Sequence, residues 1–206
     1  MSILPIYTYG SGLLRKKSKP VAELSDSVIA LIYDMVETMQ NAGGIGLAAN
    51  QVGSLDRLIV VDISEVKEDE GEELRLKNDE PKKLVLINPE VVHSDGSWSL
   101  EEGCLSIPQV RGNVTRTENI RVRFRDANFR ESELECGGLL SRVILHEIDH
   151  LNGILFLDHL GKEELKRHKE QLERIQRGEV EIVYPIVTAE AVAKPPSVAK
   201  TPSVSR

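Results

Sequence analysis

The segment LLSRVILHEIDHL, residues 139–151, limits what this chain can fold into more than any other part of it. A pair of glycines precedes it as a turn, and its length and apolar content predict a helix. Residues four apart share one face of a helix, so His146 and His150 can present two imidazole nitrogens to a single metal ion. Glu147 lies beside the first histidine and can reach a water molecule at that metal. This H-E-x-x-H pattern predicts a metal-binding helix that carries its own general base.

Chance is a poor explanation for the motif, because the chain has only five histidines and two of them fall at this spacing around a glutamate. Leu139 and Val143 precede His146 by seven and three residues, which places them on the same face of the helix. A metal bound there would lie against an apolar wall. This placement is compatible with ordinary core packing of the two residues.

The helix motif does not identify the third metal ligand. A catalytic zinc site usually takes three protein ligands and leaves the fourth position to water. Metzincin proteases continue the motif as H-E-x-x-H-x-x-G-x-x-H, but this chain has Phe156 at the last position, and a phenylalanine cannot bind a metal. Downstream, the side chains that could complete the site are Asp158, His159, Glu163 and Glu164.

Cys104, in the upstream segment WSLEEGCLSIP, is another candidate for the third ligand. A thiolate binds zinc and iron well, and the metal itself would keep the cysteine deprotonated. The preceding Gly103 lets the backbone approach a site closely. A buried free thiol accounts for Cys104 equally well. The other cysteine, Cys136, falls in an alternating strand pattern, so we expect it in the core.

The remainder of the chain combines strands and helices. Apolar runs predict strands at residues 58–63 and 84–92, with Pro89 indicating an edge or an interruption, and alternation predicts two more in IRVRFRD and ESELEC. Helical spacing after a cap at Ser25 predicts one helix, and KEELKRHKEQLERIQR, residues 162–177, predicts another. Strands dominate the middle of the chain and helices flank them, which favours an α+β fold.

The 206 residues suit a single catalytic domain, expected over residues 1–184 with a charged surface loop at 64–83. Residues 185–206 are rich in Pro, Ala, Ser, Val and Lys, and we predict a disordered tail there. The net charge of −7 argues against a broad nucleic-acid-binding face. No apolar run approaches a membrane span and the first residues do not resemble an export signal, so we expect a cytoplasmic protein with reduced thiols.

Three segments stand in order along the chain: GIGLAANQ at residues 44–51, EGCLS at 102–106 and HEIDH at 146–150. Together they resemble the peptide deformylases, whose motifs read G-φ-G-φ-A-A-x-Q, E-G-C-φ-S and H-E-φ-D-H, where φ is apolar. All three match without a break, and the similarity extends from Met1 to about Arg177. That family removes the formyl group from the initiator methionine of new polypeptides. The resemblance implies a metal-dependent hydrolase that acts on N-formylmethionyl peptides and releases formate.

The resemblance also implies a metal site and a fold. In the family the cysteine of the second motif joins the two histidines, which implies Cys104, His146 and His150 as ligands of one divalent ion. Fe²⁺ is the implied native metal, and Zn²⁺ or Ni²⁺ also suits such a ligand set. The implied fold has antiparallel sheets packed around the helix that carries HEIDH, with a C-terminal helix. The family's task implies contact with the ribosome or the nascent chain.

The catalytic roles follow from the same match. Glu147 would take a proton from the attacking water and return it to the departing amine. The Gln51 side chain and the Leu105 backbone N–H would stabilise the negative charge on the formyl oxygen. Eight further residues are expected to face or support the substrate: Gly44, Ile45 and Gly46 beside its backbone, Leu100, Leu139 and Val143 around the methionine side chain, Glu102 behind a metal ligand, and Arg111 near the peptide.

Two other functions compete with this one. A metallopeptidase that cleaves internal peptide bonds is disfavoured by Phe156 and by the EGCLS segment. A non-catalytic module with a structural zinc would need four protein ligands, and it would leave Glu147 without a role.

Overall fold

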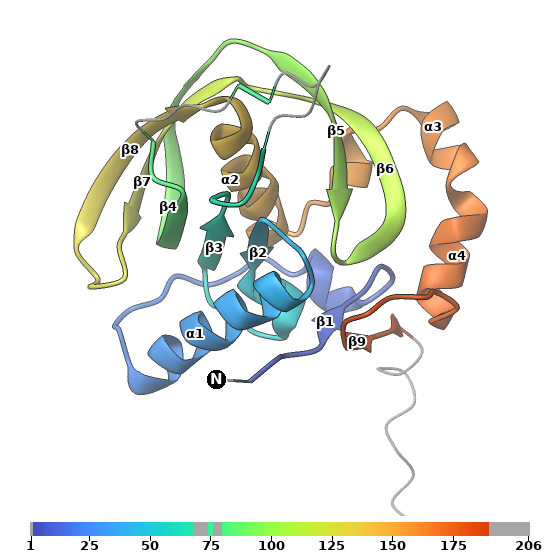
Figure 1. Ribbon diagram of the computed structural model, residues 1–206, viewed down its shortest axis with the longest axis horizontal. Helices are drawn as coiled ribbons and strands as arrows, with labels where there is room; N and C mark the ends of the chain where they lie inside the picture. Colours follow the sequence, from blue (N-terminus) through green and yellow to red (C-terminus); the bar gives the residue numbers. More distant parts are fainter. Residues whose placement is uncertain (1, 68–73, 76–79, 190–206) are drawn as a thin grey trace, which may run out of the picture.

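The computed structural model describes residues 2–67, 74–75 and 80–189 (Figure 1). Helices and strands follow one another in this order: β1 (Ile6–Tyr7), the 3-10 helix η1 (Gly12–Arg15), α1 (Asp26–Asn41), β2 (Gly46–Ala48), the 3-10 helix η2 (Ala49–Val52), β3 (Leu58–Asp62), β4 (Lys83–Asp95), β5 (Trp98–Cys104), β6 (Ile107–Arg116), β7 (Asn119–Arg125), β8 (Glu131–Gly137), α2 (Gly138–Leu151), the 3-10 helix η3 (Phe156–His159), α3 (Lys162–Arg167), α4 (Lys169–Arg177) and β9 (Ile186–Val187).

The strands form one five-stranded antiparallel sheet, an antiparallel hairpin and a short parallel pair. The large sheet has the order β2-β3-β4-β7-β8, β5 pairs with β6, and β1 pairs with β9. Figure 1 shows α2 in the middle of the molecule, with β4, β7 and β8 on one side and the β5–β6 hairpin on the other. The expected α+β fold, with antiparallel sheets around the helix that carries HEIDH, is confirmed.

Helix α2 is buried on almost every face. Its apolar residues Leu140, Val143 and Ile144 pack against Val61 of β3 and Val122 of β7 in the main core. The same helix buries four groups that can carry charge: Arg142, His146, Glu147 and His150. Burying such groups is unfavourable unless each is paired or binds an ion. These four side chains of α2 must therefore find polar partners or a bound ion inside the core.

Helix α1 covers the opposite face of the large sheet. Ser25 caps it by accepting a hydrogen bond from the Val28 N–H, as its sequence predicted. Ile32, Met35 and Met39 pack from this helix into a second apolar cluster with residues of β2 and β3. The strands β2 and β3 are thus covered by α1 on one face and by α2 on the other, which keeps the backbone that follows Gly44 in place.

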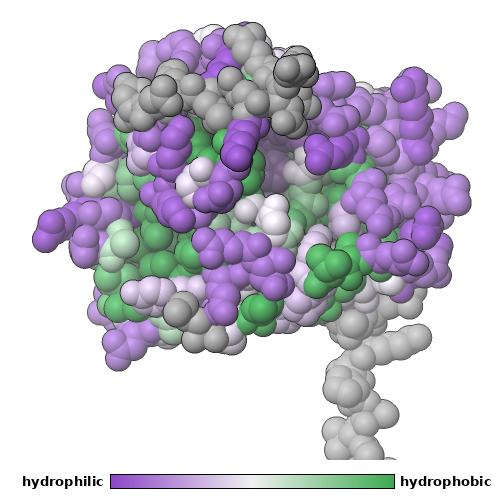
Figure 2. Space-filling view, viewed as in Figure 1, coloured by the Kyte–Doolittle hydropathy of each residue, from purple (hydrophilic) through white to green (hydrophobic). Residues whose placement is uncertain are grey.

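A third apolar cluster joins the β5–β6 hairpin to the C-terminal helices. Val114 of β6 packs here with Phe156, Leu172 and Ile175. The helix predicted over residues 162–177 is two helices, since the chain breaks at His168 between α3 and α4. Hydrophilic side chains cover most of the face seen in Figure 2, with smaller hydrophobic areas between them. Within the described residues, no helix has the length and apolar content needed to cross a membrane.

Strand β4 extends further than predicted and is central rather than an edge strand. Pro89 falls where its pairing with β7 shifts register, between Ile87 and Glu90. Asn88 adopts a positive φ of 55° there, and its side chain bonds both backbone groups of Val21. The interruption indicated by the proline is confirmed, and the bulge lets a proline exist inside a sheet.

Two predicted boundaries need correction. Half of the loop at 64–83 lies outside the described residues, but Leu74 within it is buried in the main core, so that residue is not part of a solvated loop. Its carbonyl accepts a hydrogen bond from the Leu139 N–H at the start of α2. The predicted tail begins too early, because Ile186 and Val187 pair with β1. Residues 190–206 lie outside the described part of the chain.

Candidate metal centre and active-site cleft

Three potential metal ligands converge between β5 and α2. The side-chain donor atoms of Cys104, His146 and His150 all lie within 4.8 Å of one another, and the Cys104 Sγ is 3.2 Å from the His150 Nε2. Cys104 ends β5, next to a register shift in its pairing with β6, whereas the histidines are one turn apart on α2. Burial lowers the pKa of His150, which favours the neutral imidazole that binds metals. A thiolate and two imidazoles fit a divalent transition metal.

Glu102 anchors the first histidine from behind. Its Oε2 lies 2.9 Å from the His146 Nδ1, which leaves Nε2 to face the other ligands. Arg116 holds both oxygens of this carboxylate, at 2.6 and 3.0 Å, and Arg142 donates to Oε1 at 2.6 Å. Burial alone would raise the pKa of Glu102, but the hydrogen bonds from His146 and Arg116 outweigh it and lower that pKa to about 2. The carboxylate is therefore a permanent anion beneath the site.

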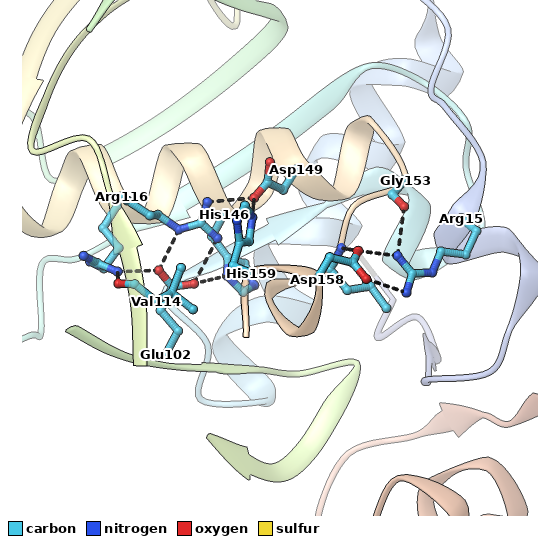
Figure 3. A network of polar contacts seen from close by, with 11 residues as sticks. Arg15, Glu102, Val114, Arg116, His146, Asp149, Gly153, Asp158 and His159 are labelled. Carbon is cyan, nitrogen blue, oxygen red and sulfur yellow. Dashed lines mark hydrogen bonds and ion pairs between the residues drawn. The ribbon is translucent and has the colours of Figure 1, made fainter. Parts of the chain in front are cut away.

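The network continues along α2 (Figure 3). Arg116 also donates to the Asp149 Oδ2 at 2.7 Å, and the same oxygen lies 2.8 Å from the His159 Nε2. Further along, the Asn50 side chain donates to the backbone carbonyl of His150 at 2.5 Å. The Arg116 contact ties α2 to the hairpin that carries the cysteine, the Asn50 contact ties it to η2, and the His159 contact ties it to η3.

Glu147 points at β2, and a glycine makes room for it. A Cβ on Gly46 would lie 2.5 Å from the Glu147 Oε1 and 2.8 Å from the Val143 Cγ1, so only glycine fits without movement. The carboxyl group is buried, and among the described residues its Oε2 has no hydrogen-bond partner. Burial raises the pKa of Glu147 to about 7, although His146 and Arg116 oppose the rise. A carboxyl group with such a pKa can both accept and donate a proton near neutral pH.

Gln51 and Leu105 lie on the other side of the cysteine. The Gln51 Oε1 accepts from the Ala48 N–H at 2.8 Å, which turns the amide nitrogen toward Ser106 Oγ at 3.2 Å and Cys104 Sγ at 3.7 Å. Leu105 occupies the turn between β5 and β6. Within the described part of the chain, its backbone N–H donates no hydrogen bond. Two N–H groups therefore flank Cys104: the Gln51 amide, which contacts Ser106 and Cys104, and the Leu105 N–H, which has no partner among the described residues.

A cleft of about 830 Å³ opens over these groups. All eight residues expected to face the substrate contribute to its walls: Gly44, Ile45, Gly46, Leu100, Glu102, Arg111, Leu139 and Val143. Gln51, Cys104, Leu105, His146 and Glu147 line it as well. A Cβ on Gly44 would lie 2.7 Å from the Leu105 Cδ1, so the two walls touch where the glycine stands. The cleft thus brings the apolar side chains of Leu100, Leu139 and Val143 together with two potential metal ligands, Cys104 and His146. The Glu147 carboxyl group, which can carry a proton, lines the same cleft.

Comparison with known proteins identifies the family. A family model described as polypeptide deformylase matches residues 3–166. The chain belongs to the polypeptide deformylase family. The peptide deformylase of Salinibacter ruber is 49% identical over 190 residues, which cover 90% of this chain and 95% of the relative. That of Chlorobium luteolum is 45% identical over 184 residues, with 89% and 92% covered.

Solved deformylase structures share the fold. The peptide deformylase of Ehrlichia chaffeensis in complex with actinonin has a TM-score of 0.76 and 36% identity, and the match covers 88% of this chain and 100% of that one. The peptide deformylase of Thermus thermophilus has a TM-score of 0.73 and 37% identity, with 86% and 100% covered. The family assignment gives the activity: this chain is a hydrolase that removes the N-formyl group from nascent polypeptides.

Three of the downstream candidates for a third metal ligand are paired with other residues. Asp158 pairs with Arg15, and Glu164 accepts from the Asn113 N–H. His159 bonds Asp149. Within the described residues, Cys104 is the group that joins the two histidines. Phe156, in place of the metzincin histidine, stacks on the His146 ring at a centroid distance of 6.2 Å.

Several residues of the deformylase cleft escaped the sequence argument. Arg142 had a signal, because it is a charged residue four positions before His146 among the apolar residues of the first half of the helix. Arg116 does not line the cleft but acts from behind it through Glu102, and its signal was the alternation of β6, in which it shares the buried face with Val110 and Val114. His168, Ile182 and Tyr184 also line the cleft, and they come from the C-terminal part of the chain, far from the three motifs. Tertiary contact alone brings them there.

Proposed function

We propose that Cys104, His146 and His150 hold one divalent metal ion, Fe²⁺ in the cell, and that Glu147, Gln51 and Leu105 carry the deformylation of N-formylmethionyl peptides beside it. The observation that carries the proposal is the convergence of the three ligand atoms within 4.8 Å at one end of the cleft. A bound divalent ion supplies Lewis-acid chemistry, acidifying water and polarising a carbonyl group. Zn²⁺ and Ni²⁺ suit the same ligands.

Glu147 is the proton carrier in this proposal. Its unpartnered Oε2 accepts the proton of the attacking water, and the same oxygen then returns it to the amine that leaves when the formyl C–N bond breaks. A pKa of about 7 supports both halves of that transfer at neutral pH. Its burial beside β2 excludes bulk water, which would otherwise compete for the proton.

Gln51 and Leu105 stabilise the charge that develops on the formyl oxygen. The Gln51 amide is held in one orientation because its Oε1 accepts from the Ala48 N–H, so the amide nitrogen is committed to donating. The Leu105 N–H supplies a second donor from the turn after Cys104. Preorganised donors of this kind act where water is absent and need no reorganisation during the reaction.

The methionine side chain enters the apolar slot formed by Leu100, Leu139 and Val143, with Ile45 beside it. These residues line the cleft next to the ligand cluster, which supports the assignment. Arg111 lies at the rim of the cleft, with its Nη1 3.6 Å from the Glu101 Oε2. It contacts the backbone of the substrate residues that follow the methionine. Because the Ehrlichia chaffeensis deformylase binds actinonin, we expect the same compound to occupy this cleft. Contact with the ribosome remains a prediction from the family's task, and a cytoplasmic location remains a prediction from the sequence.

The test is formate release from formyl-Met-Ala-Ser by anaerobically purified protein, with unformylated Met-Ala-Ser-Ala as the alternative substrate and metal analysis of the same sample. We expect formate, no cleavage of the unformylated peptide, and one equivalent of iron per chain. Cleavage of the unformylated peptide without formate release would show a peptidase instead. Zinc or nickel in place of iron would refute the metal assignment alone.

A further inference from the structure

The turn between β5 and β6 is held by two segments, one next to β1 near the start of the chain and one next to β9 in its C-terminal part. Its two residues, Leu105 and Ser106, each use the backbone carbonyl to accept a hydrogen bond from a distant segment. The Tyr9 N–H, just after β1, donates to the Ser106 carbonyl at 2.8 Å. The Tyr184 hydroxyl, just before β9, donates to the Leu105 carbonyl at 2.9 Å. The segments that carry these donors are themselves joined.

Their junction is the parallel pair of β1 and β9. The Ile6 N–H donates to the Pro185 carbonyl at 2.9 Å, and the Thr8 N–H donates to the Val187 carbonyl at 3.0 Å. On the other side of Tyr184, the Gln109 side chain donates to the Glu181 carbonyl at 3.1 Å. The segment is therefore anchored before and after the tyrosine, and these anchors hold the phenol hydroxyl at the turn.

The position of this turn matters for the deformylase reaction. Cys104, a proposed metal ligand, comes directly before it, and Leu105 carries one of the two proposed oxyanion donors. Gln51, the other donor, contacts the Ser106 hydroxyl at 3.2 Å. Electrostatic stabilisation depends on donors held within about 0.5 Å of the productive geometry. A two-residue turn at the end of a hairpin has little rigidity of its own unless neighbouring groups hold it.

We propose that Tyr184 is a positioning residue of this deformylase, which holds the Leu105 carbonyl and thereby keeps the Leu105 N–H directed at the developing oxyanion. Tyr184 lines the cleft together with Ile182, and both lie beyond residues 3–166, the part that the family model matches. The inference rests on the proposed role of Leu105. It adds a contact from the C-terminal segment to the machinery supplied by the three motifs.

The test compares Tyr184→Phe with Tyr33→Phe in the full-length, metal-loaded enzyme. Tyr33 is exposed on α1, so the control removes the same hydroxyl far from the cleft. For Tyr184→Phe we expect kcat to fall roughly three- to tenfold while KM for formyl-Met-Ala-Ser stays within about twofold. Metal content and the urea midpoint should match those of the control. The ¹⁵N signal of the Ser106 amide, which shares a peptide unit with the Leu105 carbonyl, should shift in Tyr184→Phe alone.

The results separate this inference from the proposed function. Equal kcat values for the two variants, or a higher KM at unchanged kcat, would overturn the positioning role. An unshifted Ser106 signal would show that the hydroxyl does not hold the turn. Absence of formate release by the wild-type enzyme would instead overturn the proposed function, and the Ser106 signal would still report on the contact.

Discussion

Glu102 and His146 form a buried carboxylate–imidazole pair, with the Oε2 of one 2.9 Å from the Nδ1 of the other. Two arginines, Arg116 and Arg142, hold the same carboxylate, so the negative charge of Glu102 is compensated although the group is almost fully removed from water. The contact selects the tautomer of His146 whose Nε2 is free for a metal. The helix motif therefore depends on a residue that comes forty-four positions earlier in the chain.

Glu102→Gln should weaken metal binding. The neutral amide no longer increases the basicity of His146, and it leaves two buried arginines with one partner fewer. Loss of such a contact behind a ligand typically lowers metal affinity about 10- to 100-fold. Titration of the apoprotein with Zn²⁺ against a competing chelator measures the change. Glu101→Gln, at the exposed neighbouring position, is the control, and equal affinities for the two variants would contradict the role of Glu102.

Glu147→Gln should abolish most turnover and leave the metal in place. The amide keeps the size of the side chain but cannot accept the proton of the attacking water. Loss of a general base typically costs about 10²- to 10⁴-fold in kcat. Formate release and metal analysis on the same sample measure both quantities, with Glu163→Gln on exposed α3 as the matched control. A variant that retains full activity would remove Glu147 from the mechanism.

Gly46→Ala should damage both stability and activity. The added methyl group would lie 2.5 Å from the Glu147 Oε1 and 2.8 Å from the Val143 Cγ1, so the helix or the strand must move. Overpacking of this kind typically costs about 1–3 kcal/mol of unfolding free energy. Urea denaturation and kcat report the two effects. Gly12→Ala is the control, because a Cβ there meets nothing within 4 Å. If both variants are equally stable and active, β2 is less tightly packed than the structure indicates.

Asp62 should make stability depend on acid pH. Burial opposes its charged form, but hydrogen bonds from Ser64, Lys83 and Gln40 outweigh this and lower the pKa of Asp62 to about 2. A folded-state pKa below the ordinary value of about 4 stabilises the fold above pH 4, and this contribution is lost as the pH falls from about 4 to 2.

Asp62→Asn should therefore be less stable than the wild type by about 1–2 kcal/mol at pH 7, and the difference should shrink below pH 4. Urea unfolding at a series of pH values measures it. Asp95→Asn, at a side chain that is 59% exposed, is the matched control. A difference between wild type and Asp62→Asn that does not change with pH would contradict the assigned pKa.

Local patterns identified most of the elements that frame the site. The cap at Ser25, the strand at residues 58–63 and the helix with His146 and His150 all follow from spacing and propensity, because each depends on neighbours within a few residues. The break at His168 and the strand at Ile186 were not predictable in this way. The first is decided by packing of α4 on β6, and the second by pairing with β1 at the far end of the chain.

The sequence by itself determined that this chain binds a metal on a helix beside a carboxyl group, and its three motifs placed it among the deformylases. Tertiary structure alone decided what surrounds that helix. It brings Cys104 to the histidines, Arg142 to Glu102, and Tyr184 to the Leu105 turn. Motif spacing reflects the geometry of one helix or one turn, whereas contacts between residues forty to eighty positions apart depend on how the sheets pack around α2.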